Sequence, residues 1–259
     1  MSDQDIHEMQ RRLIILESMI IDIYDATVKQ KRVCPICENE IRLYLPNPRK
    51  LFLKNQECPC CRSHQRNRTL WLYLRDHTDL FDGNKNIALL HFAPERWLHE
   101  KFSSLANVNY YPVDINADLY KEMLRKVVDI QHITYDDRMF DYIICNHVLE
   151  HAEDDLLAMR ELHRVLKPRG VAYIMVPLKW NMATTVESDL FNTTRQLRLQ
   201  YYGDENHVRL YGSDFSDRLK SAGFEVTLLD PNAAFSDEEK DMHGLNLYHK
   251  IFQCVRVER

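Results

Sequence analysis

The sequence predicts an α/β protein: a Rossmann-like, doubly wound, seven-stranded sheet, preceded by an N-terminal helix and a small zinc ribbon. Two observations predict this fold. After residue 85, short apolar runs alternate with amphipathic segments, which is the rhythm of parallel strands joined by helices. Upstream, five of the seven cysteines lie within 28 residues, a density that indicates metal binding rather than disulfides. A chain of 259 residues can bury one large core and also carry a small module.

The first domain is predicted to be a helix within residues 1–30. Its apolar side chains alternate three and four residues apart, as in a coiled-coil seam: Ile6, Met9, Leu13, Leu16, Ile20 and Ile23. This repeat covers fewer than three heptads, which is too short for a stable dimer without other packing. Two alternatives are therefore open: the helix forms a homodimer, or it packs on its own domain.

The second domain, residues 31–65, contains two C-x2-C pairs separated by twenty residues: Cys34, Cys37, Cys58 and Cys61. Each pair belongs on a tight turn that directs two thiolates toward one point, and two such turns complete a tetrahedral zinc site. Between the pairs, "IRLYL" (41–45) and "KLFLK" (50–54) alternate like the strands of a hairpin. The module is too short to have its own core, so we expect the zinc to be structural. Cys60 could replace Cys61 by a slip of one residue.

The third domain, residues 66–259, begins with a helix over 67–81 and a turn at "DGN" (82–84). Strands and helices then alternate. The expected strands are 86–92, 107–115, 127–130, 139–146 and 171–177, and the expected helices are 95–105, 117–126 and 154–166. A turn at "KPRG" (167–170) leads into the fifth strand. At the end, a helix at 213–223 precedes two strands, 224–230 and 247–257. Because no clear helix joins them, we expect an antiparallel hairpin at the sheet edge.

Polar residues follow several of these strands, at the edge where a doubly wound sheet binds its ligand. Asp114 ends the second strand, where a carboxylate can accept both hydroxyls of a ribose. Asp129 ends the third strand and could accept an adenine amino group. The first strand ends in "HFAPE" (91–95) and the fourth in "CNHVLEH" (145–151). Together these strand ends outline a nucleoside pocket.

The chain resembles a class I S-adenosylmethionine-dependent methyltransferase of the type 11 kind. The resemblance covers residues 86–256 and is strongest in "FDYIICNHVLEHAEDDLLAMRELHRVLKPRGVAYIMVP" (140–177). It implies S-adenosylmethionine as the cofactor, with Asp114 at its ribose and Asp129 and Ile130 at its adenine. Further cofactor contacts are expected from the ends of the first and fourth strands: His91, Ala93, Pro94, Glu95, Asn146 and His147.

The sequence departs from this family at two points. Most members have a glycine-rich loop after the first strand, whereas "HFAPE" contains no glycine. A subgroup with an N-terminal zinc ribbon has such a histidine-to-proline-glutamate turn, and this chain resembles that subgroup. Arg169 interrupts the usual K-P-G-G turn, although Gly170 keeps the flexible position.

The run "HVLEH" (147–151) also matches H-x-x-E-H, a zinc-peptidase signature. A buried strand ends one residue earlier, so the run belongs at a strand-to-helix turn rather than in mid-helix, which disfavours a peptidase. If a helix begins here, His147, Glu150 and His151 share one face. Certain small-RNA 2′-O-methyltransferases bind a divalent ion with a similar Glu-x-x-Glu-His, although histidine replaces the first glutamate here. The interpretation we favour is that Glu150 and His151 cap the helix and form a wall of the cofactor pocket.

Methyl transfer needs an aligned acceptor and sometimes a base. His147 and His207 are the candidate catalytic bases, each with a positioning role as the alternative. His207 belongs to a predicted substrate lid, residues 178–212. The lid is rich in aromatic and basic side chains: Trp180, Arg195, Arg198, Tyr201, Tyr202, Arg209 and Tyr211. We expect a small-molecule or glycan acceptor, either a metabolite or a sugar, with O-methylation favoured over N-methylation. A phosphorylated or otherwise anionic acceptor is an open alternative.

An RNA methyltransferase is the second hypothesis, because charge is unevenly distributed. Residues 29–68 carry ten Lys or Arg against three Glu, whereas the whole chain has a net charge of −5. A basic ribbon could bind nucleic acid through its phosphates. The acidic remainder contains no recognised RNA module, so this hypothesis ranks second. A third hypothesis is a non-enzymatic assembly protein on a methyltransferase fold.

The sequence gives no sign of a membrane or export signal. No apolar run reaches the ~18 residues needed to span a bilayer. The acidic N-terminus lacks the basic-then-apolar pattern of a signal peptide. Together with cysteines suited to metal binding, this predicts a cytoplasmic protein.

Overall fold

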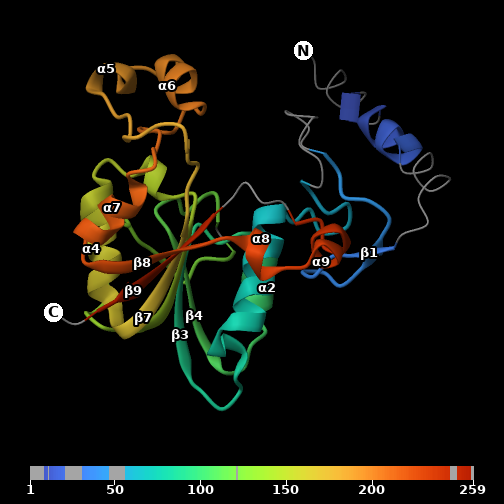
Figure 1. The fold of residues 1–259 in the computed structure, drawn as a ribbon, viewed down its shortest axis with the longest axis horizontal. Coiled ribbons are helices and arrows are strands. Elements are labelled where there is room, and N and C mark those ends of the chain that lie inside the picture. The colour runs from blue at the N-terminus through green and yellow to red at the C-terminus, as the bar shows by residue number, and fades with distance from the viewer. Residues whose placement is uncertain are drawn as a thin grey trace. The chain divides into compact units, whose positions relative to one another are not determined.

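The computed structural model describes residues 9–10, 12–20, 31–46, 56–120, 122–245 and 250–257 (Figure 1). Contacts divide the chain into two compact units. One comprises Met1–Leu72 with Phe235–Asn246, and the other comprises Tyr73–Ala234 with Leu247–Arg259. This division differs from the expected boundary between residues 65 and 66. A segment near the C-terminus belongs to the ribbon unit, a long-range pairing that local sequence patterns do not indicate.

The larger unit is built on a seven-stranded sheet with the order β5-β4-β3-β6-β7-β9-β8. The strands from β5 to β7 are parallel, and β9 is antiparallel to both β7 and β8. The strands are β3 (Ile87–Phe92), β4 (Val108–Asp114), β5 (Lys126–Val127), β6 (Phe140–Asn146), β7 (Leu166–Met175), β8 (Phe224–Leu229) and β9 (Ile251–Arg256). The predicted doubly wound sheet is confirmed, and so is the antiparallel pair at its edge. The expectation that no helix joins this pair is wrong, because the short helices Pro231–Ala234 and Asp237–Met242 lie between its two strands along the chain.

Helices connect these strands. They are α3 (Arg96–Ser103), α4 (Asp155–Val165), α5 (Asp189–Asn192), α6 (Arg195–Tyr202), α7 (Phe215–Ser221) and α8 (Pro231–Ala234), with 3-10 turns η1 (Asp79–Phe81) and η2 (Leu149–His151). Figure 1 shows α4 and α7 side by side, and the two helices are in contact. No helix in the described part of the chain is long and apolar enough to cross a membrane.

Helix α4 illustrates how the sequence fixes the segment after β6. Its N-cap is Asp154, whose carboxylate accepts a hydrogen bond from the Leu157 amide at 2.8 Å. One side of the helix is buried in the main core: Ala158, Met159, Leu162 and Val165. Burial of each large apolar side chain stabilises the fold by about 1.5–3 kcal/mol. The cap and the core together hold the short turn between β6 and α4 in place.

The helix predicted over 117–126 is wrong. The described residues 117–120 and 122–123 form turns instead. Side chains compete with the helix here, because Asp114 accepts a hydrogen bond from the Asn116 amide at 2.6 Å and Asn116 accepts one from the Leu119 amide at 3.1 Å. The strand expected at 127–130 is correspondingly reduced to the two residues of β5.

The turn expected at 167–170 lies inside β7 instead. Strand β7 begins at Leu166, opposite Phe140, and the register shifts between Phe140 and Tyr142. A register shift of this kind absorbs extra residues without ending the strand. Gly170 permits the close approach of strands β6 and β7, because an added Cβ would lie 3.1 Å from the Phe140 carbonyl oxygen.

The smaller unit contains the cysteine module. Strand β1 (Arg32–Val33) pairs antiparallel with β2 (Glu40–Ile41). Helix α9 (Asp237–Met242) belongs to this unit, and α2 (Gln65–His77) begins in it. Isolated bridges join Glu57 to Leu45 and to His64. The second predicted hairpin strand, 50–54, lies outside the described residues.

The N-terminal segment is helical over the described residues 9–10 and 12–20, and the rest of the predicted helix lies outside them. All described apolar side chains of this segment are at least half exposed: Met9, Leu13, Ile14, Ile15, Leu16, Met19 and Ile20. Dimerisation through this helix stays a prediction.

The C-terminal segment of the ribbon unit is bonded to residues near the cysteines. Arg32 forms an ion pair with Asp241 at 2.7 Å. Arg68 donates to the carbonyl oxygens of His243, at 2.9 Å, and Gly244, at 2.8 Å. These bonds are buried or partly buried, so each stabilises more than an exposed one. The ribbon is therefore completed by residues that follow it by about two hundred positions.

Gly244 packs its backbone directly against the Tyr44 ring. An added Cβ would lie 2.1 Å from that ring, and φ at Gly244 is +57°. We expect Gly244→Ala to destabilise the ribbon unit by about 2–4 kcal/mol, because overlap and left-handed backbone both disfavour a side chain. Thermal unfolding measures the effect. Gly83→Ala is the control, since nothing lies within 4 Å of its added Cβ. Equal losses in both variants would contradict the assignment.

Candidate functional site

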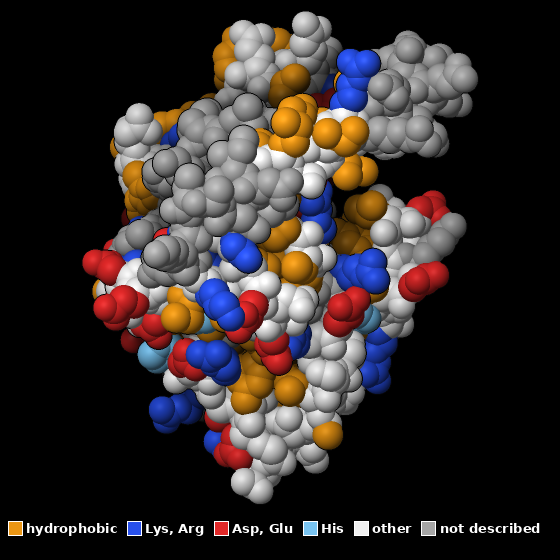
Figure 2. Space-filling view, turned by 90° about the vertical axis from the view of Figure 1, so that its right-hand side faces the viewer, with side chains coloured by type: hydrophobic (Ala, Val, Ile, Leu, Met, Phe, Trp, Pro, Cys, Tyr) orange, Lys and Arg blue, Asp and Glu red, His pale blue; other side chains and the backbone are white. Residues whose placement is uncertain are grey.

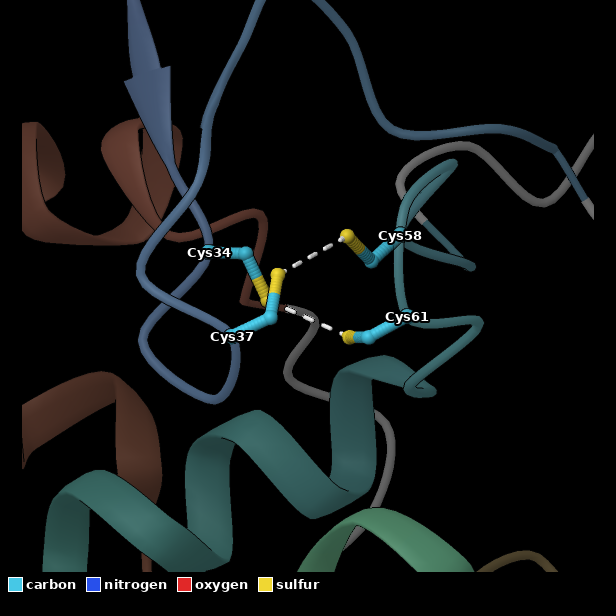
Figure 3. Close-up of side chains that lie close together, drawn as sticks. All are labelled: Cys34, Cys37, Cys58 and Cys61. Carbon is cyan, nitrogen blue, oxygen red and sulfur yellow. Dashed lines mark hydrogen bonds between the residues drawn. The ribbon is translucent and has the colours of Figure 1, made fainter.

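Four cysteine sulfurs converge in the ribbon (Figure 3): those of Cys34, Cys37, Cys58 and Cys61, all within 4.8 Å of one another. The Cys34 sulfur lies 3.8 Å from that of Cys61, and the Cys37 sulfur lies 3.9 Å from that of Cys58. In a tetrahedral zinc site with Zn–S bonds of about 2.3 Å, neighbouring sulfurs lie about 3.8 Å apart. The four residues therefore fit a zinc ion with little rearrangement.

Two equivalent turns direct the sulfurs toward one another. The residues that follow the two pairs, Glu38 and Arg62, both have φ of 63°. The Glu38 amide donates to the Cys34 carbonyl at 2.8 Å, and the Arg62 amide donates to the Cys58 carbonyl at 2.9 Å. Each turn closes over its pair and brings two cysteines, three positions apart, to the same side. The repeated C-x2-C spacing thus corresponds to a repeated backbone conformation.

Arg68 places a positive charge near the four cysteines. Its side chain is fully buried, with the guanidinium carbon 4.0 Å from the Tyr44 ring centroid. It donates to the Ser63 carbonyl, and the Ser63 hydroxyl lies 3.1 Å from the Cys61 sulfur. A zinc ion with four thiolates has a net charge of about −2, so a nearby cation lowers the cost of burying it.

The three remaining cysteines lie outside this cluster. Cys60 is exposed, so Cys61 is the fourth member of the cluster. Cys145 and Cys254 are fully buried, and burial raises the pKa of both thiols. A raised pKa disfavours the reactive thiolate, so neither is suited to act as a nucleophile.

A cleft opens at the carboxyl ends of the parallel strands in the larger unit. Its walls contain Asp114, Asp129 and Ile130, three of the predicted cofactor residues, and also His151. The other lining residues were not singled out from the sequence: Phe92, Ile115, Val128, Gln131, Val148 and Ala152. Most of them directly flank the same strand ends, which is the signal that could have found them. Carboxylates combined with apolar walls suit a nucleoside.

The other predicted cofactor residues lie outside the walls of this cleft, at the ends of β3 and β6: His91, Ala93, Pro94, Glu95, Asn146 and His147. His91 is fully buried, and its ring nitrogens lie 2.8 Å from the Tyr110 hydroxyl and 3.2 Å from the Glu95 carboxylate. Its side chain therefore holds Glu95 in place, and direct contact of His91 with the cofactor stays a prediction.

Two non-glycine residues at the ends of β3 and β6 have left-handed backbone conformations. Ala93 has φ of 49° and His147 has φ of 54°. Strands β3 and β6 are neighbours in the sheet, so both strained turns lie at the same edge. Each costs on the order of 1 kcal/mol, and such strain clusters at functional sites. Ala93 also explains the loop without glycine, because alanine adopts there a conformation that glycine commonly supplies.

A buried carboxylate lies beside His147. Glu150 is 1% exposed, and its Oε1 lies 3.2 Å from the His147 Nδ1. Its Oε2 has no hydrogen-bond partner within the described part of the chain, and neither does the side chain of buried Asn146. Buried polar atoms nearly always have partners. These atoms therefore make the edge of the sheet beside His147 a candidate ligand site.

His207, the second predicted base, lies near the same carboxylate. One ligand atom from each of Glu150, His151 and His207 falls within 4.8 Å of the others. Burial lowers the pKa of His207, so its ring is neutral at neutral pH. The run 147–151 is not in mid-helix: its last three residues form only the turn η2. The helical arrangement that a zinc peptidase needs is therefore absent from this described segment.

The predicted lid is anchored to the turn after β6. Buried Arg209 donates to the carbonyl oxygens of Leu149, at 3.0 Å, and Glu153, at 2.8 Å. The Val208 amide donates to the Glu150 carbonyl at 2.9 Å. Helices α5 and α6 of this segment lie away from the sheet (Figure 1). The anchoring explains how His207 reaches residues that precede it by more than fifty positions.

Comparison with known proteins identifies one family. A family described as "Methyltransferase domain" matches residues 83–229. Among curated proteins, an uncharacterized protein of Methanocaldococcus jannaschii is 32% identical over 84 residues, which cover 31% of this chain and 36% of that protein. The match thus spans about a third of that relative's length.

Among solved structures, the chain resembles the [4+2]-cyclase SpnF, with a TM-score of 0.50 and 17% identity over 79% of this chain and 86% of that chain. It also resembles phosphoethanolamine N-methyltransferase 2 of Haemonchus contortus, solved with S-adenosyl-L-methionine. That TM-score is 0.47, with 16% identity over 74% of this chain and 53% of that chain. At these identities the likeness concerns the fold alone, and a fold does not fix a reaction.

Proposed function

Because the chain belongs to the methyltransferase-domain family, which matches more than half of its length, we propose that it transfers a methyl group from S-adenosylmethionine to a small acceptor. One observation supports the proposal most directly. Asp114 and Asp129, expected from the strand ends to hold a nucleoside, line one cleft together with Ile130, which the family resemblance assigns to the adenine. Asp114 would accept the ribose hydroxyls, and Asp129 with Ile130 would hold the adenine.

The cofactor, when bound, supplies a methyl group on a positively charged sulfur. The turn from Ala93 to Glu95 and the side chain of Asn146 are proposed to border its methionine part. His147 is the proposed base, because the Glu150 carboxylate can hold its Nδ1 proton and orient the ring. An acceptor hydroxyl would give its proton to the ring as its oxygen takes the methyl group, whose bond to the cofactor's sulfur breaks with the electron pair left on sulfur. Zinc in the ribbon has a structural role in this proposal.

The proposed acceptor is a small metabolite or a sugar with oxygen as the methylated atom. The lid offers fewer cations than its sequence suggests, because Arg198 donates to the carbonyl oxygens of Asn192 and Glu205 and Arg209 is equally committed. Arg195 stays exposed, as does much of Trp180. Lys179 is the other exposed cation of this segment. Two cations with aromatic surface suit a small anionic group better than an extended polyanion.

RNA methylation stays the second candidate because the ribbon's positive charge is partly neutralised. Lys31 pairs with Glu40 at 2.8 Å, and Arg62 pairs with Glu57 at 2.5 Å. Arg68 is buried against carbonyl oxygens. Figure 2 shows basic and acidic side chains interspersed on the described part of one face rather than a broad basic patch. Strong binding to phosphates needs several such cations together.

Fluorescence anisotropy with labelled single- and double-stranded RNA separates the two candidates. We expect dissociation constants of about 100 μM or weaker at physiological salt, the weak end of non-specific binding. Tight binding that weakens at least ~1,000-fold between about 50 and 200 mM salt would instead indicate many phosphate contacts and favour the RNA hypothesis.

A further inference from the structure

We propose that Glu150, His151 and His207 bind a divalent metal ion beside the cofactor cleft, and that the ion holds the oxygen atoms of the acceptor. The metal site is argued from these three residues. Its use in positioning an acceptor rests on the proposed methyl transfer. This assignment gives His207 to the metal and leaves His147 as the base.

The geometry of the three side chains brings their ligand atoms to one point. All three atoms lie within 4.8 Å of one another, and the rings of His151 and His207 meet edge to face with centroids 4.9 Å apart. Ligands bound to one ion at about 2.0–2.2 Å lie roughly 3–4.3 Å apart. Small side-chain rotations therefore suffice to bring them around one ion. The motif and the lid supply these ligands from two segments that the anchoring of Val208 holds together.

The buried carboxylate calls for a cation. Glu150 is 1% exposed, and its Oε2 lacks a hydrogen-bond partner among the described residues. An uncompensated buried carboxylate is costly, so such groups are paired or coordinate a metal. The neighbouring Nδ1 of His147 engages only the other oxygen, at 3.2 Å. Oε2 is therefore available to a metal ion.

The two histidines have nitrogens suited to the same ion. His151 Nδ1 lies 3.1 Å from the Asn206 carbonyl oxygen, which places the ring proton on Nδ1 and leaves Nε2 as a ligand. A carbonyl that orients a metal-binding histidine in this way is a regular feature of metal sites. The buried Nδ1 of His207 has no hydrogen-bond partner within the described part of the chain.

Three protein ligands leave other coordination positions of the ion open. These open positions face the cofactor cleft. His151 also lines the cleft that contains Asp114 and Asp129. An ion held there would lower the pKa of a bound hydroxyl and fix its direction. The acceptor class that fits is a compound with two adjacent oxygen ligands, such as a vicinal diol, one oxygen of which takes the methyl group. A single isolated amine lacks this chelating pair.

Manganese(II) is the probe that separates this site from the ribbon. Four thiolates select zinc, whereas imidazole and carboxylate ligands also accept manganese. The full-length, zinc-loaded protein is titrated with Mn²⁺ and followed by calorimetry and by loss of the free-ion paramagnetic resonance signal. We expect one Mn²⁺ site per chain, weakened at least tenfold in both Glu150→Gln and His207→Gln. Glu153→Gln, the same change at an exposed neighbour, is the control and keeps the site.

Circular dichroism confirms that each variant is folded, and His207→Gln tests the site if Glu150→Gln fails to fold. Absence of Mn²⁺ binding in the wild type, or equal binding in wild type and variants, would overturn the proposal. A parallel titration with S-adenosylmethionine keeps the two proposals apart. Mn²⁺ binding without S-adenosylmethionine binding would sustain the metal site and overturn the proposed function. The reverse result would overturn the metal site alone.

Discussion

Replacing Cys58 with serine is expected to lower the zinc content from about one ion per chain to near zero and to unfold the ribbon. Cys58 is fully buried, and its sulfur lies 3.9 Å from that of Cys37. A hydroxyl is a poor substitute for a thiolate ligand, and metal binding in such modules supplies on the order of 10 kcal/mol. Cys34→Ser is expected to have the same effect. Metal analysis by mass spectrometry measures the zinc, and hydrogen exchange measures the loss of protection around β1 and β2.

Cys60→Ser is the matched control for both variants. Cys60 is exposed and outside the cluster, although it directly precedes Cys61. The Cys60→Ser variant should keep its zinc and its hydrogen-exchange protection around β1 and β2. Loss of zinc in Cys60→Ser, with retention in Cys61→Ser, would show that the register of the second turn is wrong.

Replacing Asp114 with asparagine is expected to weaken S-adenosylmethionine binding by about 10- to 100-fold. The carboxylate is proposed to accept two ribose hydroxyls, and each charge-assisted hydrogen bond is worth about 1.5–3 kcal/mol. Calorimetry compares the dissociation constants. Asp136→Asn, an identical change at an exposed position away from the cleft, should leave them unchanged. Equal affinity in the wild type and Asp114→Asn would show that the proposed ribose contact is wrong.

The affinity for S-adenosylmethionine is also expected to depend on pH, because it depends on the ionisation of Asp114. Burial raises the pKa of Asp114 above its usual 3.8, although nearby amides and His151 oppose the shift. Because the ionised form is the one that accepts two hydrogen bonds, affinity should fall as the pH decreases through this raised pKa. The loss should therefore begin at a higher pH than for an ordinary aspartate. Affinity that stays constant as the pH is lowered toward 3.8 would contradict this role of Asp114.

The spacing of apolar residues predicted the helices that bury one face and the strands that bury one or both faces. The strand expected at 139–146 is β6 (Phe140–Asn146), and the helix expected at 154–166 is α4 (Asp155–Val165). It failed at 117–126, where side-chain bonds from Asp114 and Asn116 favour turns over a helix. The spacing of apolar residues could not assign residues 235–246 to the ribbon unit. This assignment depends on individual long-range contacts, such as the hydrogen bond from Arg68 to the Gly244 carbonyl.

Spacing also predicted the cysteine cluster, because two C-x2-C turns admit few other arrangements. Strand order predicted that Asp114 and Asp129 would share a cleft, because the ends of parallel strands meet at one edge, and the family resemblance added Ile130. The sequence did not indicate that His91 would be buried against Glu95 and Tyr110. Nor did it bring His207 near Glu150, because that proximity depends on how residues 178–212 are anchored.

The central claim is that the cleft at the strand ends holds S-adenosylmethionine. Calorimetric titration of the folded, zinc-loaded protein with S-adenosylmethionine tests it most directly. We predict one site per chain with a dissociation constant on the order of micromolar, about −8 kcal/mol. A well-folded protein that shows no binding would contradict both enzymatic hypotheses and would favour a non-enzymatic assembly role for the fold.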